Sequence, residues 1–158
     1  MSIQKPKMIL FDYGHTLLYE IGHNAEKGNK AIYQYIKSNP KNISFQEFNK
    51  IVNSTFKKIN ECGNGIDICE KNFLRLVYWY MNIELSVSLE EAESIIWNGV
   101  SEGDIMPNAN KILDYLNKND IRSGVISNMC WSGKSLKDRL NRLLPNNKSE
   151  VVERFPEL

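Results

Sequence analysis

The chain has 158 residues, of which 42% are hydrophobic and 25% charged, a composition typical of a soluble domain that buries a core. The 20 basic and 19 acidic residues leave a formal net charge of +1, which argues against nucleic acid or an anionic lipid surface as the main partner. The polar N-terminus predicts no signal peptide, and no apolar run approaches the roughly 20 residues that span a bilayer. Three cysteines without CxxC spacing fit free thiols in a reducing compartment, so a cytoplasmic location is expected.

The first predicted element is a strand over the short apolar run Met8–Phe11. A continuous apolar run of this length is typical of a strand that is buried on both faces of a parallel sheet. Asp12 follows it directly, and Gly14 and Thr16 come shortly after. A polar loop therefore begins where this strand ends.

The middle of the chain predicts three or four consecutive amphipathic helices. The first covers Ala25–Lys37, and a capping box at Ser44–Glu47 opens the second. Asp67–Glu70 has the form of another helix start, and Ser88–Glu91 opens a shorter fourth helix. Together these helices are expected to form a helical unit.

The pattern changes after about residue 103. Pro107 suits the first position of a helix, because proline lacks an amide hydrogen that a helix start leaves unused. A second strand is predicted over residues 121–126, ending in Ser127 and Asn128, and one more helix over 135–144.

A third strand is predicted at Glu150–Phe155. These elements indicate an α/β fold, with an incomplete Rossmann-like parallel sheet as core and an inserted α-helical cap. Residues 1–19 and 104–158 would form the discontinuous core, and residues 20–103 the cap. In such sheets ligands bind beyond the carboxyl ends of the strands, where this chain has polar residues.

The residues at these strand ends suit phosphoryl chemistry. The Asp12 carboxylate could attack an electrophilic phosphorus while loop amides and Ser127 bind the phosphoryl oxygens. Mg²⁺, which prefers oxygen ligands, would bring the anionic phosphate up to the anionic carboxylate. The competing interpretation is that these are ordinary turn and helix-cap residues.

Two segments resemble a known family. "ILFDYGHTL" is similar to the first motif of the haloacid dehalogenase-like hydrolase superfamily, an apolar strand followed by Asp-x-Asp-Gly-Thr-Leu. "GVISN" resembles its second motif, and the helical stretch between them resembles the family's helical cap. The resemblance runs from about Met8 to Asn128.

The resemblance implies a Mg²⁺-dependent, phosphatase-type enzyme that acts on a small phosphorylated metabolite. Asp12 would be the nucleophile that forms an aspartyl-phosphate. Its carboxylate and the backbone carbonyl of Gly14 would hold Mg²⁺. Ser127 would bind the transferring phosphoryl group, with Asn128 and Thr16 as supporting phosphate-binding residues.

The chain departs from the family pattern at the position of Gly14. Phosphatases of the family carry there an aspartate that protonates the leaving oxygen and then activates water. Members that handle phosphonates or carbon–halogen bonds also lack this acid. His15 is an alternative proton donor, although a surface or packing role suits a loop histidine at this position better.

A second departure follows Asn128, where the family's later lysine and paired acids have no match. The chain is therefore expected to be a shortened form, weak or inactive alone, whose exposed sheet edge self-association could cover. The alternative is a non-catalytic paralogue that serves as a binding or interaction module. A phosphorelay receiver is a third hypothesis, disfavoured because receivers lack a large helical insertion after the first strand.

Aromatic residues suggest where a substrate could lie. Trp131 comes shortly after the second strand, near the expected mouth of the site, and is the better candidate for a substrate contact. Trp79, Tyr80 and Trp97 lie on predicted helices, where packing is the simpler interpretation.

Overall fold

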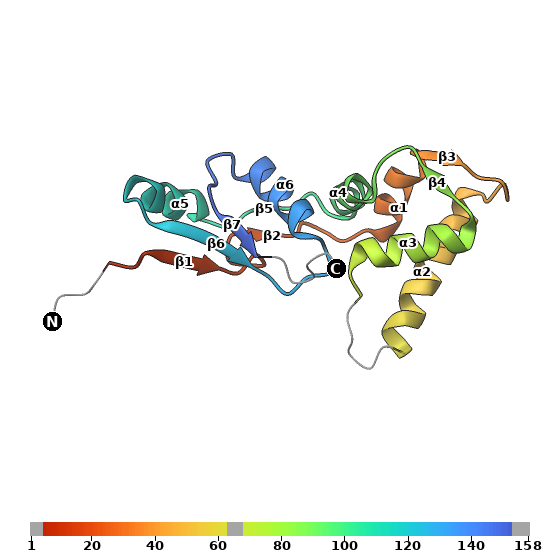
Figure 1. The fold of residues 1–158 in the computed structure, drawn as a ribbon, viewed down its shortest axis with the longest axis horizontal. Helices are drawn as coiled ribbons and strands as arrows, with labels where there is room; N and C mark the ends of the chain where they lie inside the picture. The colour runs from red at the N-terminus through yellow and green to blue at the C-terminus, as the bar shows by residue number, and fades with distance from the viewer. Residues whose placement is uncertain (1–4, 63–67, 153–158) are drawn as a thin grey trace.

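The computed structural model describes residues 5–62 and 68–152. Over these residues the chain forms six helices and a three-stranded parallel sheet, so the predicted mixed α/β class is confirmed. Figure 1 shows an elongated molecule, with the sheet at one end and most of the helices at the other. No helix in this part of the chain has the length and apolar composition needed to cross a membrane.

The parallel sheet has the strand order β1-β6-β7. Strand β1 (Met8–Phe11) pairs in parallel with β6 (Arg122–Ile126), as the sequence predicts. Strand β7 (Glu150–Val152) pairs in parallel with β6, which confirms the third strand over these residues; 153–155 lie outside the described residues. Phe11 lies opposite Val125, so β1 and β6 end at the same edge of the sheet.

Helices α5 (Ala109–Lys118) and α6 (Gly133–Leu143) lie over one side of the sheet (Figure 1). Their apolar faces bury Val125 completely in a cluster that includes Leu113, Leu136 and Leu140. In contrast, Leu10 of β1 is 53% exposed and Ile126 of β6 is 46% exposed. Self-association that would cover these exposed strand residues stays a prediction.

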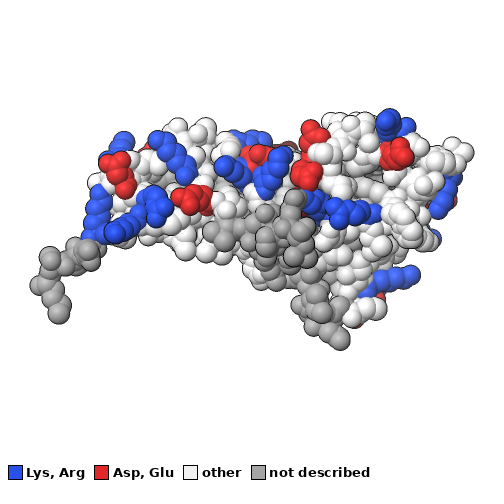
Figure 2. Space-filling model, viewed as in Figure 1, with Lys and Arg blue, Asp and Glu red and all other residues white. Residues whose placement is uncertain are grey.

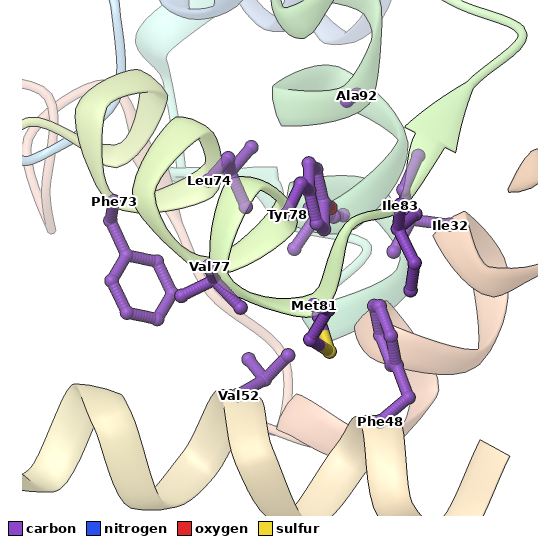
Figure 3. Packing of buried hydrophobic residues seen from close by; sticks show 11 residues of the cluster. Ile32, Phe48, Val52, Phe73, Leu74, Val77, Tyr78, Met81, Ile83 and Ala92 are labelled. Atoms are coloured by element: carbon purple, nitrogen blue, oxygen red, sulfur yellow. The ribbon is translucent and has the colours of Figure 1, made fainter. Parts of the chain in front are cut away.

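The other four helices are α1 (Ala25–Tyr33), α2 (Phe45–Cys62), α3 (Glu70–Met81) and α4 (Leu89–Val100). They share a second hydrophobic cluster, drawn in Figure 3, to which α2 contributes Phe48 and Val52 and α3 contributes Met81. A Cβ added at Gly99 of α4 would lie 2.9 Å from the Cα of Gly28 in α1, so these glycines allow the two helices to pack closely. This tight pairing holds α4 against α1. Helix α4 lies next to the part of the molecule that contains the sheet (Figure 1).

Two of these helices begin with capping boxes, of which the sequence predicts the one at Ser44 and only a helix start at Ser88. The Ser44 hydroxyl accepts a hydrogen bond from the Glu47 amide at 3.4 Å, and Glu47 accepts one from the Ser44 amide at 3.0 Å. Ser88 and Glu91 repeat the arrangement at α4. The predicted start at Asp67 lies outside the described residues, and α3 begins at Glu70.

Two sequence-based predictions of helix extent were wrong. The helix predicted over Ala25–Lys37 ends at Tyr33, because residues Ile36–Ser38 form β3 and pair with β4 (Glu84–Leu85). Pro107 lies in a turn, and α5 begins only at Ala109. The intervening Asn108 has φ = 69°, a left-handed conformation that asparagine tolerates and that a helix cannot continue.

The chain leaves the sheet region after β2 (Leu18–Tyr19) and returns through β5 (Asp104–Ile105). These two strands, which the sequence does not predict, pair antiparallel and hold the outgoing and returning segments together. On the face seen in Figure 2, basic and acidic side chains of the described residues alternate, in agreement with the near-zero net charge.

Candidate functional site

A pocket of about 430 Å³ lies beyond the carboxyl ends of β1 and β6. It contains four of the five predicted site residues, namely Asp12, Gly14, Ser127 and Asn128. Thr16 is exposed and is not among the lining residues. The other lining residues are Tyr13, Glu20, His23, Trp97, Val100, Ser101, Met129 and Trp131.

Asp12 is exposed at the start of the loop that follows β1. This loop folds back on itself, since the amides of Leu17 and Leu18 each donate to the carbonyl of Tyr13 at 3.1 Å. A Cβ added at Gly14 would meet nothing within 4 Å, so the space beside this residue is open. His15 is exposed, has φ = 55° and does not line the pocket, which matches a surface role.

Two tryptophans form an aromatic part of the pocket wall. Trp131, from the segment after β6, stacks on Trp97 of α4 with ring centroids 5.0 Å apart and planes 3° apart. Trp97 is 4% exposed and so is packed as the sequence suggests, yet it also lines the pocket. Trp131 is half-buried and packs against both hydrophobic clusters.

A buried arginine of α6, Arg139, supports the loop that carries Asp12. Its side chain is 1% exposed, and its Nη2 donates to Oε2 of Glu20 at 2.7 Å. Its Nε donates to the hydroxyl of Tyr13 at 2.9 Å, and that hydroxyl donates to Oε1 of Glu20 at 2.6 Å. The residue next to Asp12 is therefore fixed by a closed set of charge-assisted hydrogen bonds.

Arg139 also holds the returning chain segment. Its Nη2 donates to the carbonyl of Ser101 at 2.8 Å, and Gly103 lies so close that a Cβ there would come within 2.5 Å of the guanidinium. Gly103 has φ = 68°, so both its conformation and its contact with Arg139 favour glycine. One side chain thus joins α6 to both segments that connect the sheet with α1–α4.

These contacts determine the ionisation of Glu20 and Tyr13. Burial alone would raise the pKa of Glu20, but hydrogen bonds from Ser101 and Tyr13, the charge of Arg139 and a bond from Trp97 outweigh it and lower this pKa. Burial and the hydrogen bond to Glu20 raise the pKa of Tyr13 well above its usual value. Glu20 is therefore a stable carboxylate, a poor proton donor for catalysis.

The pocket offers few ligands for a metal ion. Among the described residues there is no group of three or more His, Cys, Asp or Glu side chains that could hold one. Asp12 supplies one free-standing carboxylate, Gly14 a backbone carbonyl, and both oxygens of Glu20 already accept hydrogen bonds. This donor set fits Mg²⁺, which keeps several waters and binds through one or two carboxylates together with a substrate phosphate.

Several lining residues were missed from the sequence, notably Tyr13, Glu20 and His23. One signal for Glu20 was present, because Arg139 lies on the same helical stripe as Leu136 and Leu140. A buried arginine on an apolar stripe needs an acidic partner. Nothing in the sequence shows that this partner is 119 positions away.

A second polar cluster lies where α3 contacts the segment before α6 and α4 contacts the start of α6. Glu93 is fully buried, and its Oε2 accepts hydrogen bonds from Ser132 at 2.5 Å and Ser135 at 3.1 Å. Glu70 is 8% exposed, and its amide donates to the carbonyl of Cys130 at 2.9 Å. These contacts attach the segment after β6 to α3 and α4.

Burial dominates the ionisation of this cluster. Burial, together with the nearby charge of Glu93, raises the pKa of Glu70 to about 7, although the Cys130 thiol partly offsets the shift. Burial also raises the pKa of Glu93, despite its hydrogen bonds from Ser132 and Ser135. Both carboxyls therefore hold their protons more tightly in the folded chain than in the unfolded one.

Comparison with known proteins adds no assignment, because no protein-family model matches the chain. No curated protein gives a significant match. A function is therefore proposed from the pocket geometry and from the two motifs.

Replacing Arg139 with methionine should lower the free energy of unfolding by about 2 to 3 kcal/mol, because Glu20 and Tyr13 lose a buried partner. Arg142→Met, in the next turn of the same helix, is the matched control. Arg142 is exposed and donates to Asn98 and to the Glu102 carbonyl, so its loss should cost less than about 1 kcal/mol. Urea unfolding midpoints measure both effects, and equal losses would contradict the assigned role of Arg139.

Stability should fall as pH rises from about 4.5 to about 7, because the folded chain keeps the Glu70 proton that the unfolded chain releases. The expected loss is about 3 kcal/mol, and Glu93 acts in the same direction. The lowered pKa of Glu20 matters only below about pH 4.5, outside this window.

Glu70→Gln should flatten this pH dependence, because glutamine keeps the shape without the ionisation. The exposed residue Glu84 provides the control variant Glu84→Gln. Urea unfolding at pH 5, 6 and 7.5 measures the slope for each variant. A slope that Glu70→Gln leaves unchanged would exclude Glu70 as its source.

Proposed function

We propose that this chain is a Mg²⁺-dependent hydrolase of the haloacid dehalogenase-like type, acting on a small phosphorylated metabolite in the cytoplasm. In this proposal the sheet is a Rossmann-like core formed by residues 1–19 and 104–158, and residues 20–103 are its helical cap. The observation that carries the proposal is that Asp12 and Ser127 follow neighbouring parallel strands and line one pocket. A turn or capping role alone would give no reason for this shared pocket.

The proposed reaction begins at the Asp12 carboxylate. One carboxylate oxygen forms a bond to phosphorus while the bond from phosphorus to the alcohol oxygen breaks. The leaving alcohol oxygen takes a proton from water. Water then attacks the phosphorus of the aspartyl-phosphate, releasing inorganic phosphate and restoring the carboxylate. Ser127 and Asn128 would hold the phosphoryl oxygens during both steps.

The charges of the pocket explain why a divalent cation belongs to the proposal. Asp12 and Glu20 line the pocket, whereas no lysine or arginine is among the described lining residues. A phosphate beside Asp12 would meet only negative charge. Asp12 and the Gly14 carbonyl would hold Mg²⁺, whose charge would offset the repulsion between the two anions.

The alternative function is a non-catalytic phosphate-binding or interaction module. The open space at Gly14 favours it, because the acid that phosphatases of the resembled family use is missing there. Glu20 cannot replace that acid, since its carboxylate is held ionised by Arg139 and Tyr13. Turnover therefore decides between the two functions.

Asp12→Asn should abolish any Mg²⁺-dependent phosphatase activity, because the amide has nearly the same shape without nucleophilic charge. Binding of beryllofluoride, which mimics the phosphoryl group on Asp12, should also be lost. The control is Asp120→Asn, an exposed aspartate that precedes β6 at the opposite edge of the sheet, and it should change neither property. Unchanged turnover in Asp12→Asn would exclude covalent catalysis at this residue.

Gly14→Asp should speed release of phosphate by roughly 100-fold to 10,000-fold, the usual effect of a positioned proton donor. The site has room for the new side chain, since a Cβ there meets nothing within 4 Å. Gly14→Asn is the matched control, having the same shape without an acid. Steady-state phosphate release with phenyl phosphate measures both variants; equal rates would show that proton transfer does not limit turnover.

A further inference from the structure

We infer that the pocket selects phosphate compounds whose organic part is a flat, uncharged aromatic ring. This inference rests on the proposed function for the position of the phosphate beside Asp12 and Ser127. The polar strand ends form one side of the pocket, and Trp97, Trp131 and other apolar groups form another. A ligand that fills both sides needs an anionic end and an apolar end.

The aromatic side is an ordered stack. The Arg139 guanidinium carbon lies 4.5 Å from the Trp97 ring centroid, and Trp131 stacks parallel to Trp97 at 5.0 Å. Two such partners cannot share one face of the indole, so Trp97 lies between them. Trp131 is the last ring of the stack and lines the pocket. In this inference a planar ligand ring stacks on the part of Trp131 that lines the pocket.

The charges of the pocket disfavour a charged organic part. Arg139 is already paired with Glu20 at 2.7 Å, and no lysine or arginine is among the described lining residues, so a second anionic group on the ligand would find no such cationic partner. A cationic group would gain little, because both Glu20 oxygens accept hydrogen bonds from Tyr13, Trp97 or Arg139. An uncharged ring avoids both costs.

The pocket volume fits two sources of such a ring. At about 430 Å³ it falls within the usual range for small-molecule sites. It can hold an aryl phosphate or a nucleoside monophosphate, in which a sugar separates ring and phosphate. The organic part of both compounds contains a flat, uncharged aromatic ring.

The test compares phosphonates, because their carbon–phosphorus bond keeps binding separate from hydrolysis. Calorimetric titration of the full chain with Mg²⁺ should show phenylphosphonate binding about 5-fold to 100-fold more tightly than methylphosphonate, the usual range for stacking of one ring. A carboxylate added at the 4-position of the ring should remove most of that gain. Tighter binding of the 5′-phosphonate analogue of adenosine monophosphate than of phenylphosphonate would identify a nucleotide as the source, and weaker binding an aryl phosphate.

Variants locate the preference. Trp131→Leu should make the two phosphonates bind about equally, whereas Trp131→Phe should retain most of the preference because it keeps a ring. Trp79→Leu, at a tryptophan that is 78% exposed on α3 and does not line the pocket, is the matched control and should behave as the parent chain. Since Trp131 packs against both clusters, thermal unfolding checks that each variant is folded. If Trp131→Leu does not fold, the parent chain and Trp131→Phe decide the outcome.

Equal binding of phenylphosphonate and methylphosphonate by the parent chain would overturn the inference, as would a ring preference that survives in Trp131→Leu. Phosphate release from phenyl phosphate and glycerol 1-phosphate is measured separately. A ring preference in binding without turnover would support the aromatic site and remove the proposed catalysis. Turnover without a ring preference in binding would keep the catalysis and remove the aromatic site.

Discussion

The buried guanidinium of Arg139 is the constraint on which the arrangement of the site depends. A charge that is 1% exposed must be paired, and its partners Tyr13, Glu20 and Ser101 come from the loop after β1 and from both connecting segments. Asp12 therefore takes its position from a residue that follows it by 127 places in the chain. The same side chain packs on Trp97, so the polar and aromatic walls of the pocket share one support.

The segment between β6 and α6 also contacts both ends of the molecule, the sheet and the helices α1–α4. Ser127 and Asn128 begin it at the sheet, Trp131 packs against both hydrophobic clusters, and Ser132 donates to the buried Glu93 of α4. The residues proposed to contact the phosphate and the residue proposed to contact the ring thus belong to one short run of the chain. Any change in how α3 and α4 hold this run would move both sides together.

The sequence predicts those parts of the fold that local chemistry determines. Apolar runs at Met8–Phe11 and before Ser127 predict the neighbouring strands β1 and β6, and side-chain patterns at Ser44 and Ser88 predict two helix starts. Prediction from the sequence fails where distant pairing overrides local preference. Ile36 pairs with Leu85 in a strand, although its spacing suits a helix. The site divides in the same way, because Asp12 and Ser127 are visible as strand ends, whereas Glu20 becomes part of it only through Arg139.

The two acidic groups beside the pocket respond to pH in opposite ways because their surroundings differ. Glu20 is held ionised by donors from Tyr13, Trp97 and Arg139, so the loop that carries Asp12 keeps its support across neutral pH. Glu70 lacks such compensation, and its pKa is raised to about 7 by burial and by Glu93. The amide of Glu70 donates to the carbonyl of Cys130, so this acid adjoins the segment that carries Trp131. The loop that carries Asp12 is held by a different set of contacts, those of Arg139 to Tyr13 and Glu20.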